Sequence, residues 1–415
     1  MKLIQKGLAI SASLFFITSC ATYQSTVNPA REKLKSGQTA DALADLKKLA
    51  EKEDGDQLVH MLDYATALQY AGETKESSRI FQKADKFAEM QDYHSVSKLT
   101  GSLLFSQEMV QYKGDTFELI FINALNSLNY LQDGNLDDAL VEARRINEKY
   151  LKLRADEKKK FELNPFSKYL SAMLWEAGGN YDDAYIAYKE AYDLDLGSPL
   201  LRKDLLRAAL LARRDDEYQT WRSKFPEEAK EVKKPSRDQG ELIVLFLQGW
   251  GPRKESDPNA RTMPILRHVP SEADRLNITI SDVGVGQFDY QSVLLYDVEK
   301  AAIQTLAEDR ASLVGKRIGG VVAKEVMADQ IRQKNEALGA VAWIAMYASD
   351  RADLRQWSLL PQTIQIVRQP LPAGRHWITA KSLNAAGAVL EELKPRQEFT
   401  IKAGRKHFMV VRSLK

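Results

Sequence analysis

Cys20 is the only cysteine of the 415-residue chain, and its setting predicts covalent lipid attachment. Lys2 and Lys6 give the chain a basic start, and the apolar stretch 7–17 leads to small residues directly before the cysteine. A secretory signal peptide has this order of basic end, short apolar core and small residues at the cleavage site. We therefore expect a lipoprotein signal peptide over residues 1–19 and a mature chain that begins with lipidated Cys20. An ordinary signal peptide with a cysteine there by chance is the alternative.

The predicted lipid anchor determines where the protein should be found. A diacylglycerol and an N-acyl chain on Cys20 would make membrane attachment effectively permanent, and we expect no other cofactor. The residue after the cysteine is Ala21 and not the aspartate that retains enteric lipoproteins in the inner membrane. We therefore expect the outer membrane, with the folded part mostly facing the periplasm, and display on the outer surface is the alternative. The net charge of +2 gives no bias toward nucleic acid.

Residues that could form a catalytic or metal site are scattered along the chain. The five histidines, none of them at the spacing of a His-Glu-x-x-His motif, are His60, His94, His268, His376 and His407. A Gly-x-Ser-x-Gly nucleophile elbow is also absent from the sequence. The glycine-rich stretches 315–320 and 284–286 lack the phosphate-loop and dinucleotide patterns, so we expect turns there. The sequence therefore predicts no catalytic residue, no metal site and no enzyme.

Two groups of arginine, lysine and tryptophan are the candidate partner-binding residues. Asp353, Arg355 and Trp357 lie between a helical stretch and a strand, and Trp250 and Lys254 lie in the loop 249–254. Arginine and tryptophan are common hot spots of protein interfaces, so an exposed edge that presents Arg355 and Trp357 is one interpretation. The structural interpretation is that an Asp353–Arg355 pair fixes the turn and that Trp357 packs below it.

Four segments of the first half share one helical pattern. In each segment a glycine is followed by a small residue five positions later and by buried-type residues four and seven positions beyond that. Such a glycine can end one helix with a positive φ, and the small residue lets the next helix pack closely. The segments read Gly37, Ala42, Leu46, Leu49; Gly72, Ser77, Phe81, Ala84; Gly134, Ala139, Ala143, Ile146; and Gly179, Ala184, Tyr188, Ala191. The pattern resembles the tetratricopeptide repeat, which implies an array of helical hairpins over residues 20–225 whose concave face grips a protein partner.

The second half changes to the period of strands. Residues 226–240 are rich in charge and proline and indicate a linker, and 241–247 is an apolar run of strand length. Short strands separated by Pro/Gly turns follow, so residues 241–415 should form a mixed domain that ends in a small antiparallel β-sandwich. Helix formers at 299–313 and 321–348 predict inserted helices, and the apolar part 337–348 is too short to span a bilayer. The fold class is therefore α+β, with a helical repeat array followed by a β-sandwich-like domain with inserted helices.

The whole mature chain resembles a largely uncharacterised family of proteobacterial outer-membrane lipoproteins with the same two halves. The residues that carry this resemblance are 249–254, Ala352 to Trp357, Leu360 to Arg368 and Leu371 to Gly374. The resemblance implies an association with cell-wall synthesis and no particular reaction, since members of the family often accompany lipoproteins that activate cell-wall synthases.

Together these features favour a lipid-anchored periplasmic adaptor that binds envelope proteins through its repeats, in cell-wall or outer-membrane assembly. A carbohydrate-binding protein or hydrolase with its site in the second domain is one alternative. A subunit of a membrane-associated secretion or envelope complex, with residues 337–348 as its contact, is the other.

Overall fold

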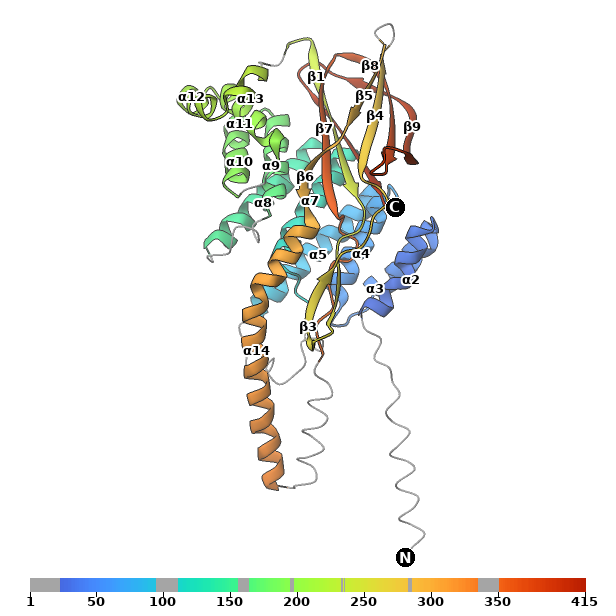
Figure 1. Cartoon of the computed structure of the whole chain (residues 1–415), viewed down its shortest axis with the longest axis vertical. Helices are drawn as coiled ribbons and strands as arrows, with labels where there is room; N and C mark the ends of the chain where they lie inside the picture. The colour runs from blue at the N-terminus through green and yellow to red at the C-terminus, as the bar shows by residue number, and fades with distance from the viewer. Residues whose placement is uncertain are drawn as a thin grey trace, which may run out of the picture.

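The computed structural model describes residues 23–94, 111–155, 164–194, 198–232, 234, 236–282, 286–334 and 351–415. Cys20 and the predicted contact stretch 337–348 lie outside the described residues. Helices make up the first half of the described chain, and strands make up most of the second half (Figure 1). The predicted α+β fold class is therefore confirmed.

The helices of the first half pair as antiparallel hairpins, so this half is a tetratricopeptide-like repeat array. Consecutive helices contact one another along the chain, and each hairpin also packs against the next one. The pairs are α2 Tyr23–Lys35 with α3 Thr39–Ala50, α4 Gln57–Tyr70 with α5 Thr74–His94, α7 Thr116–Gln132 with α8 Leu136–Ala155, α9 Pro165–Ala177 with α10 Tyr181–Asp193, and α11 Pro199–Leu211 with α12 Asp215–Lys224.

The glycine turns explain why these hairpins form. Gly37, Gly72, Gly134 and Gly179 have φ values of 80°, 81°, 71° and 80°, a region that residues with a side chain rarely adopt. The backbone N–H of the residue after each glycine donates to a carbonyl in the last turn of the preceding helix. Asn180 N, for example, donates to the Trp175 carbonyl at 2.9 Å. The small residues five positions after the glycines, Ala42, Ser77, Ala139 and Ala184, are fully buried against the partner helix.

A fifth hairpin, α11 with α12, has an arginine where the others have glycine. Arg213 adopts a φ of 56°, and Arg214 N donates to the Ala209 carbonyl at 3.0 Å, which is the same helix ending. The glycine pattern could not reveal this repeat.

The predicted linker 226–240 is partly regular, since Pro226–Glu231 forms the short helix α13 and β1 begins at Gln239. Charge and proline density indicated irregular chain there, but proline at the first helical position is compatible with a helix.

The strands form two four-stranded sheets and a hairpin. The first sheet has the order β10-β1-β7-β6 and contains β10 Lys406–Ser413, β1 Gln239–Gln248, β7 Thr363–Pro372 and β6 Val293–Asp297. The second sheet is antiparallel, has the order β5-β4-β8-β9, and contains β5 Gly286–Gln291, β4 Arg275–Asp282, β8 Gly374–Leu383 and β9 Val389–Ile401. The hairpin consists of β2 Arg253–Asp257 and β3 Ala260–Arg267. The expectation of a purely antiparallel sandwich is wrong at one position, because β10 pairs with β1 in parallel.

Strand β1 is buried on both faces, which explains its uninterrupted apolar run. Leu242, Val244 and Phe246 pack between the two sheets, while Ile243 and Leu245 face the helices. The first sheet is therefore the middle layer of three, with the second sheet on one side and the repeat array on the other (Figure 1).

Helix α14 Val298–Lys334 is one continuous helix of 37 residues, and it extends away from the rest of the molecule (Figure 1). The predicted turn at 315–320 is wrong, because Gly315 and Gly319 both lie inside this helix. Glycine lowers helix propensity by only about 1 kcal/mol relative to alanine, which the good helix formers on both sides offset.

Of the glycine stretch 284–286, only Gly286 is described, and it is the first residue of β5. In the described part of the chain, no helix has the length and apolar character needed to cross a membrane.

The hairpin turns give a matched pair of substitutions. Gly72→Ala places a side chain at a φ of 81° in open space, so it should lower the free energy of unfolding by about 1 kcal/mol through backbone strain alone. Arg213→Gly relieves the same strain in the fifth hairpin and should raise the free energy of unfolding by about 0.5 kcal/mol, after the entropy cost of glycine. Urea unfolding measures both. Destabilisation by Arg213→Gly would contradict the assignment of this turn.

Candidate functional site

The four residues predicted to bind a partner are buried within the chain. Trp250, Lys254, Arg355 and Trp357 expose 5%, 8%, 2% and 2% of their surface. The prediction that an exposed edge presents Arg355 and Trp357 is therefore wrong. These side chains lie where the second half of the chain packs on the repeats, and Arg355 and Trp357 contact residues that precede them by 239 to 300 positions in the sequence.

Arg355 forms the predicted pair with Asp353 and also reaches the repeats. Its Nε and Nη2 donate to the two Asp353 carboxylate oxygens at 2.9 and 2.7 Å. Its Nη1 donates to the Asp56 carboxylate at 3.2 Å and to the Gly55 carbonyl at 3.3 Å, at the start of α4. The turn is therefore fixed as the structural interpretation predicted, and the same guanidinium also ties it to the first helix of the second hairpin.

Trp357 is inserted among three repeat helices. Its indole Nε1 donates to Thr66 Oγ1 of α4 at 2.9 Å, and its backbone N–H donates to the Glu118 carboxylate of α7 at 2.9 Å. Its ring centroid lies 5.8 Å from that of Phe81 on α5. Trp357 thus packs below the Arg355 turn, as the structural interpretation predicted, but it packs on the repeats.

The loop residues Trp250 and Lys254 support the same junction. Lys254 Nζ donates to the Arg355 carbonyl at 3.0 Å and lies 3.6 Å from the Asp115 carboxylate. Trp250 Nε1 donates to the Leu414 carbonyl at 2.8 Å. Lys254 therefore links the two groups of candidates, which the sequence presented as separate. Arg253 and Lys254 belong to strand β2, so the predicted loop ends at Pro252.

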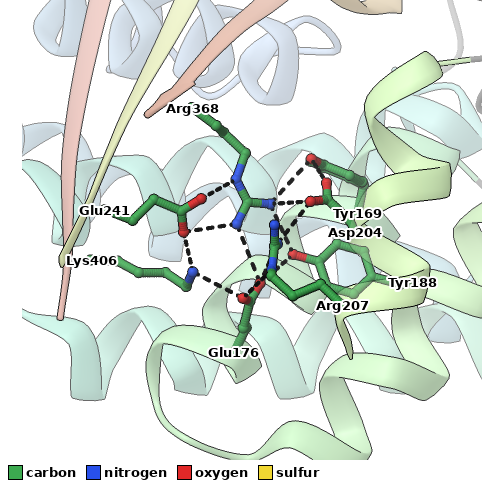
Figure 2. Close-up of polar contacts among 8 residues, drawn as sticks. All are labelled: Tyr169, Glu176, Tyr188, Asp204, Arg207, Glu241, Arg368 and Lys406. Carbon is green, nitrogen blue, oxygen red and sulfur yellow. Dashed lines mark hydrogen bonds and ion pairs between the residues drawn. The ribbon is translucent and has the colours of Figure 1, made fainter. Parts of the chain in front are cut away.

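A second part of the junction is a buried cluster of charges that the sequence did not reveal (Figure 2). Three carboxylates, three cations and two tyrosines converge from helices α9, α10 and α11 and from strands β1, β7 and β10. We call these eight residues the junction cluster: Tyr169, Glu176, Tyr188, Asp204, Arg207, Glu241, Arg368 and Lys406.

Arg368 of β7 is the centre of the junction cluster. Its Nε and Nη2 donate to the two Glu241 carboxylate oxygens at 2.9 Å each, which is the strong bidentate geometry. On the helical side its Nη1 lies 3.0 Å from the Asp204 carboxylate, and its Nη2 lies 3.4 Å from that of Glu176. One guanidinium thus connects the sheet to two repeat helices.

Glu176 is the corresponding centre on the helical side. Its carboxylate accepts hydrogen bonds from Arg207 at 3.0 and 3.1 Å, from Lys406 at 3.0 Å and from the Tyr188 hydroxyl at 2.8 Å. Burial alone would raise the pKa of Glu176, but the three cations of the junction cluster hold that pKa well below its usual value. The pKa of Glu241 is lowered for the same reason.

The geometry of the junction cluster suits attachment and not catalysis. Each carboxylate is already paired with at least one cation, so none is free to act as a general acid or base. Among the residues that the structure describes, no group of histidine, aspartate and glutamate could hold a metal ion.

Two further buried carboxyl groups lie in the Trp357 part of the junction, and their environment raises their pKa values. Asp63 accepts hydrogen bonds from Tyr23 at 2.5 Å and from Leu359 N at 3.1 Å, and burial raises its pKa to about 6. Glu118 accepts from Tyr112 at 2.5 Å, and burial together with the charge of Asp115 raises its pKa to about 7.

These contacts show that the chain covers the inner face of its own repeats. The residues involved lie on the first helix of successive hairpins: Asp63 and Thr66 on α4, Glu118 on α7, Tyr169 and Glu176 on α9, and Asp204 on α11. One continuous apolar core joins these helices to β1, β7 and the segment around Trp357. The sequence predicted that this face grips a partner, but the structure shows that the second half of the chain occupies it.

The described surface retains a groove beside strand β10. It has a volume of about 430 Å³ and lies between β10, β9 and the ends of repeat helices α7 and α9. Its lining includes the cationic side chains Lys394, Arg405 and Lys406, the imidazole of His407, and the half-buried Phe408. No local sequence pattern predicts this groove, because its walls come from three distant segments.

Removal of Arg368 tests whether the junction cluster holds the two halves together. Arg368→Met leaves Glu241 and Asp204 with less compensation inside the protein, so we expect the free energy of unfolding to fall by about 3–5 kcal/mol. The matched control Arg79→Met removes an exposed Arg–Glu pair on α5 and should cost less than about 1 kcal/mol. Denaturant unfolding measures both, and equal small losses would contradict the role of Arg368.

The raised pKa of Glu118 predicts a pH-dependent stability difference. A carboxyl whose pKa is higher in the folded state stabilises the fold below its unfolded pKa, and this contribution is lost as the pH rises through about 7. Glutamine does not ionise, so Glu118→Gln removes this loss of stability at high pH. The variant should therefore gain stability relative to the wild type between pH 5 and pH 8, by up to about 3 kcal/mol. Unfolding curves at several pH values test this, with Glu255→Gln, a half-exposed carboxyl outside the junction, as a control that should not show this gain.

Two of the similar solved structures each cover about half of this chain. No family model and no curated protein matches the chain. Among solved structures, MamA from Desulfovibrio magneticus RS-1 is 16% identical over 49% of this chain and 90% of its own, with a TM-score of 0.32. The TPR-like repeats of a kinesin light chain from Podosopora anserina are 14% identical over 50% of this chain and 93% of their own, with a TM-score of 0.34.

Proposed function

We propose that the protein is a lipid-anchored scaffold on the periplasmic side of the outer membrane, and that it binds an envelope protein through the groove beside β10. The anchor rests on the signal that ends at Cys20. Helix α2 begins at Tyr23, so the folded body would start almost directly at the membrane. The family resemblance favours cell-wall or outer-membrane assembly as the process.

The observation that carries the binding proposal is the open outer edge of β10. Glu241 N donates to the Arg405 carbonyl and Gly249 N to the Ser413 carbonyl, both at 3.0 Å. The odd-numbered residues of β10 therefore direct their backbone groups toward β1. The backbone N–H and C=O groups of Phe408 and its even-numbered neighbours point the other way, toward the groove. Such an edge can accept an additional strand.

The side chains around this edge indicate an extended and acidic partner segment. Among the described residues, Lys394 and Arg405 have no ion-pair partner, so both cations are available to an acidic segment. Glu398 is the only carboxylate of the lining and lies 4.0 Å from Arg375. The half-buried Phe408 offers an apolar contact beside the strand. Backbone pairing would supply affinity, and the cations would select acidic side chains.

Site-specific photo-crosslinking in intact cells tests this proposal. A photoreactive residue at Gln397, in the groove, should give one discrete adduct with an envelope protein, whereas one at the exposed Gln287 of β5 should not. Charge reversal by Lys394→Glu with Arg405→Glu should reduce the adduct about tenfold, since like charges would then oppose the acidic segment. The matched pair Lys48→Glu with Lys83→Glu changes the net charge equally on exposed repeat helices and should leave the adduct unchanged.

The same cells test the anchor. Cys20→Ala should abolish labelling with radioactive palmitate and should release the protein from the membrane fraction. Equal adducts from Gln397 and Gln287, or an adduct that survives the groove charge reversal, would overturn the binding site. Membrane-bound and labelled protein in the Cys20→Ala variant would overturn the anchor.

A further inference from the structure

A second cavity lies on another side of the junction, between helix α2 and the last residues of the chain. Its volume is about 260 Å³. Its walls come from α2, the loop before β2, the segment between β3 and β4, and the chain end: Arg31, Glu32, Lys35, Trp250, Arg253, Val269, Pro270, Glu272, Leu414 and Lys415.

Arg31 in this cavity is a buried cation whose charge is offset only in part, by Asp63 and Glu32. Only 3% of its surface is exposed, and its Nε and Nη1 are buried and have no hydrogen-bond partner. Within the described chain, it forms no ion pair with any carboxylate. Its guanidinium carbon lies 5.2 Å from the centroid of the Trp250 ring, which fixes its position beside the indole. A buried guanidinium in this state is costly unless an anion meets it.

Arg253 makes the site more positive. Its buried Nε also has no hydrogen-bond partner, and it lines the same cavity. The pKa of Arg31 is lowered by its burial and by the positive charge of Arg253, so the two guanidinium groups repel each other. The lining carries four cationic side chains, including Lys35 and Lys415, and two carboxylates, Glu32 and Glu272. One bound anion would offset the repulsion between the two guanidinium groups.

We infer that this cavity binds the phosphoryl group of a small anionic ligand. Two guanidinium groups from different elements match the several acceptor oxygens of a phosphate, and arginine forms bidentate contacts with this group. The volume leaves room for a phosphoryl group with a small substituent. Water could fill the cavity, but it would not offset the repulsion between the two guanidinium groups. The ligand is either the headgroup of an anionic phospholipid or a soluble phosphorylated compound.

Equilibrium dialysis of the full chain with radioactive inorganic phosphate, in a chloride background of constant ionic strength, tests this inference. Cys20→Ala keeps the chain free of acyl chains, so the result does not depend on the proposed anchor or groove. We expect one saturable site per chain. Arg31→Met and Arg253→Met should each weaken binding about tenfold or more, because each removes charge-assisted hydrogen bonds.

Arg412→Met is the matched control. Arg412 is a buried arginine whose Nε and Nη1 also have no partner, but it does not line this cavity. It should leave phosphate binding unchanged. Without phosphate, Arg31→Met should unfold at the same temperature as the wild type or above it, since burial and repulsion by Arg253 outweigh the attraction of Asp63. If Arg31→Met fails to fold, the half-buried Arg253 provides the deciding variant.

Vesicles separate the two sources of phosphate. Arg31-dependent binding to phosphatidylglycerol vesicles, and none to phosphatidylcholine vesicles, would identify a lipid headgroup. Binding of phosphate and glycerol 3-phosphate without vesicle binding would identify a soluble ligand. The absence of saturable phosphate binding, or equal binding by Arg31→Met, would overturn the inference and leave a cavity that holds only water.

Discussion

The structure depends on charge compensation across the boundary between helices and strands. On the helical side, Glu176 and Asp204 face a single guanidinium, that of Arg207, so this side has an excess of one negative charge. On the strand side, Arg368 and Lys406 face a single carboxylate, so the excess is one positive charge. Neither half is neutral in this region without the other, and buried charge without compensation is costly. Docking of the halves is therefore part of the fold and not a later association of two finished domains.

This constraint changes which surfaces are available for function. A tetratricopeptide-like array normally offers its inner face to a ligand. Here β1 and β7 cover that face with a continuous apolar core, and the segment around Trp357 inserts into the helices. The positions where an external peptide would be expected are therefore occupied by the chain itself. Docking also creates new surfaces, and the groove beside β10 is one of them, because repeat ends and strands form its walls together.

Local patterns could predict the elements of this fold but not how they meet. The glycines at 72 and 179 revealed their hairpins because a positive φ restricts the residue type, whereas Arg213 adopts the same φ without that signature. Glycines at 315 and 319 indicated a turn but lie in a helix, since propensity is weaker than the surrounding helix formers. The parallel pairing of β10 with β1 joins residues about 165 positions apart, which no local pattern encodes. Glu241 and Arg368 look like ordinary surface charges in the sequence, and their burial follows from long-range docking alone.

Two kinds of buried charge in this molecule have different physical meanings. In the junction cluster every carboxylate has a cation from the same chain, so its energy is already favourable in the isolated protein. Arg31 and Arg253 repel each other, and the charges of Asp63 and Glu32 offset that of Arg31 only in part. Missing hydrogen-bond partners alone do not require a ligand, since the buried Arg412 lacks them as well. What favours a bound anion is that two guanidinium groups repel each other in the wall of one cavity.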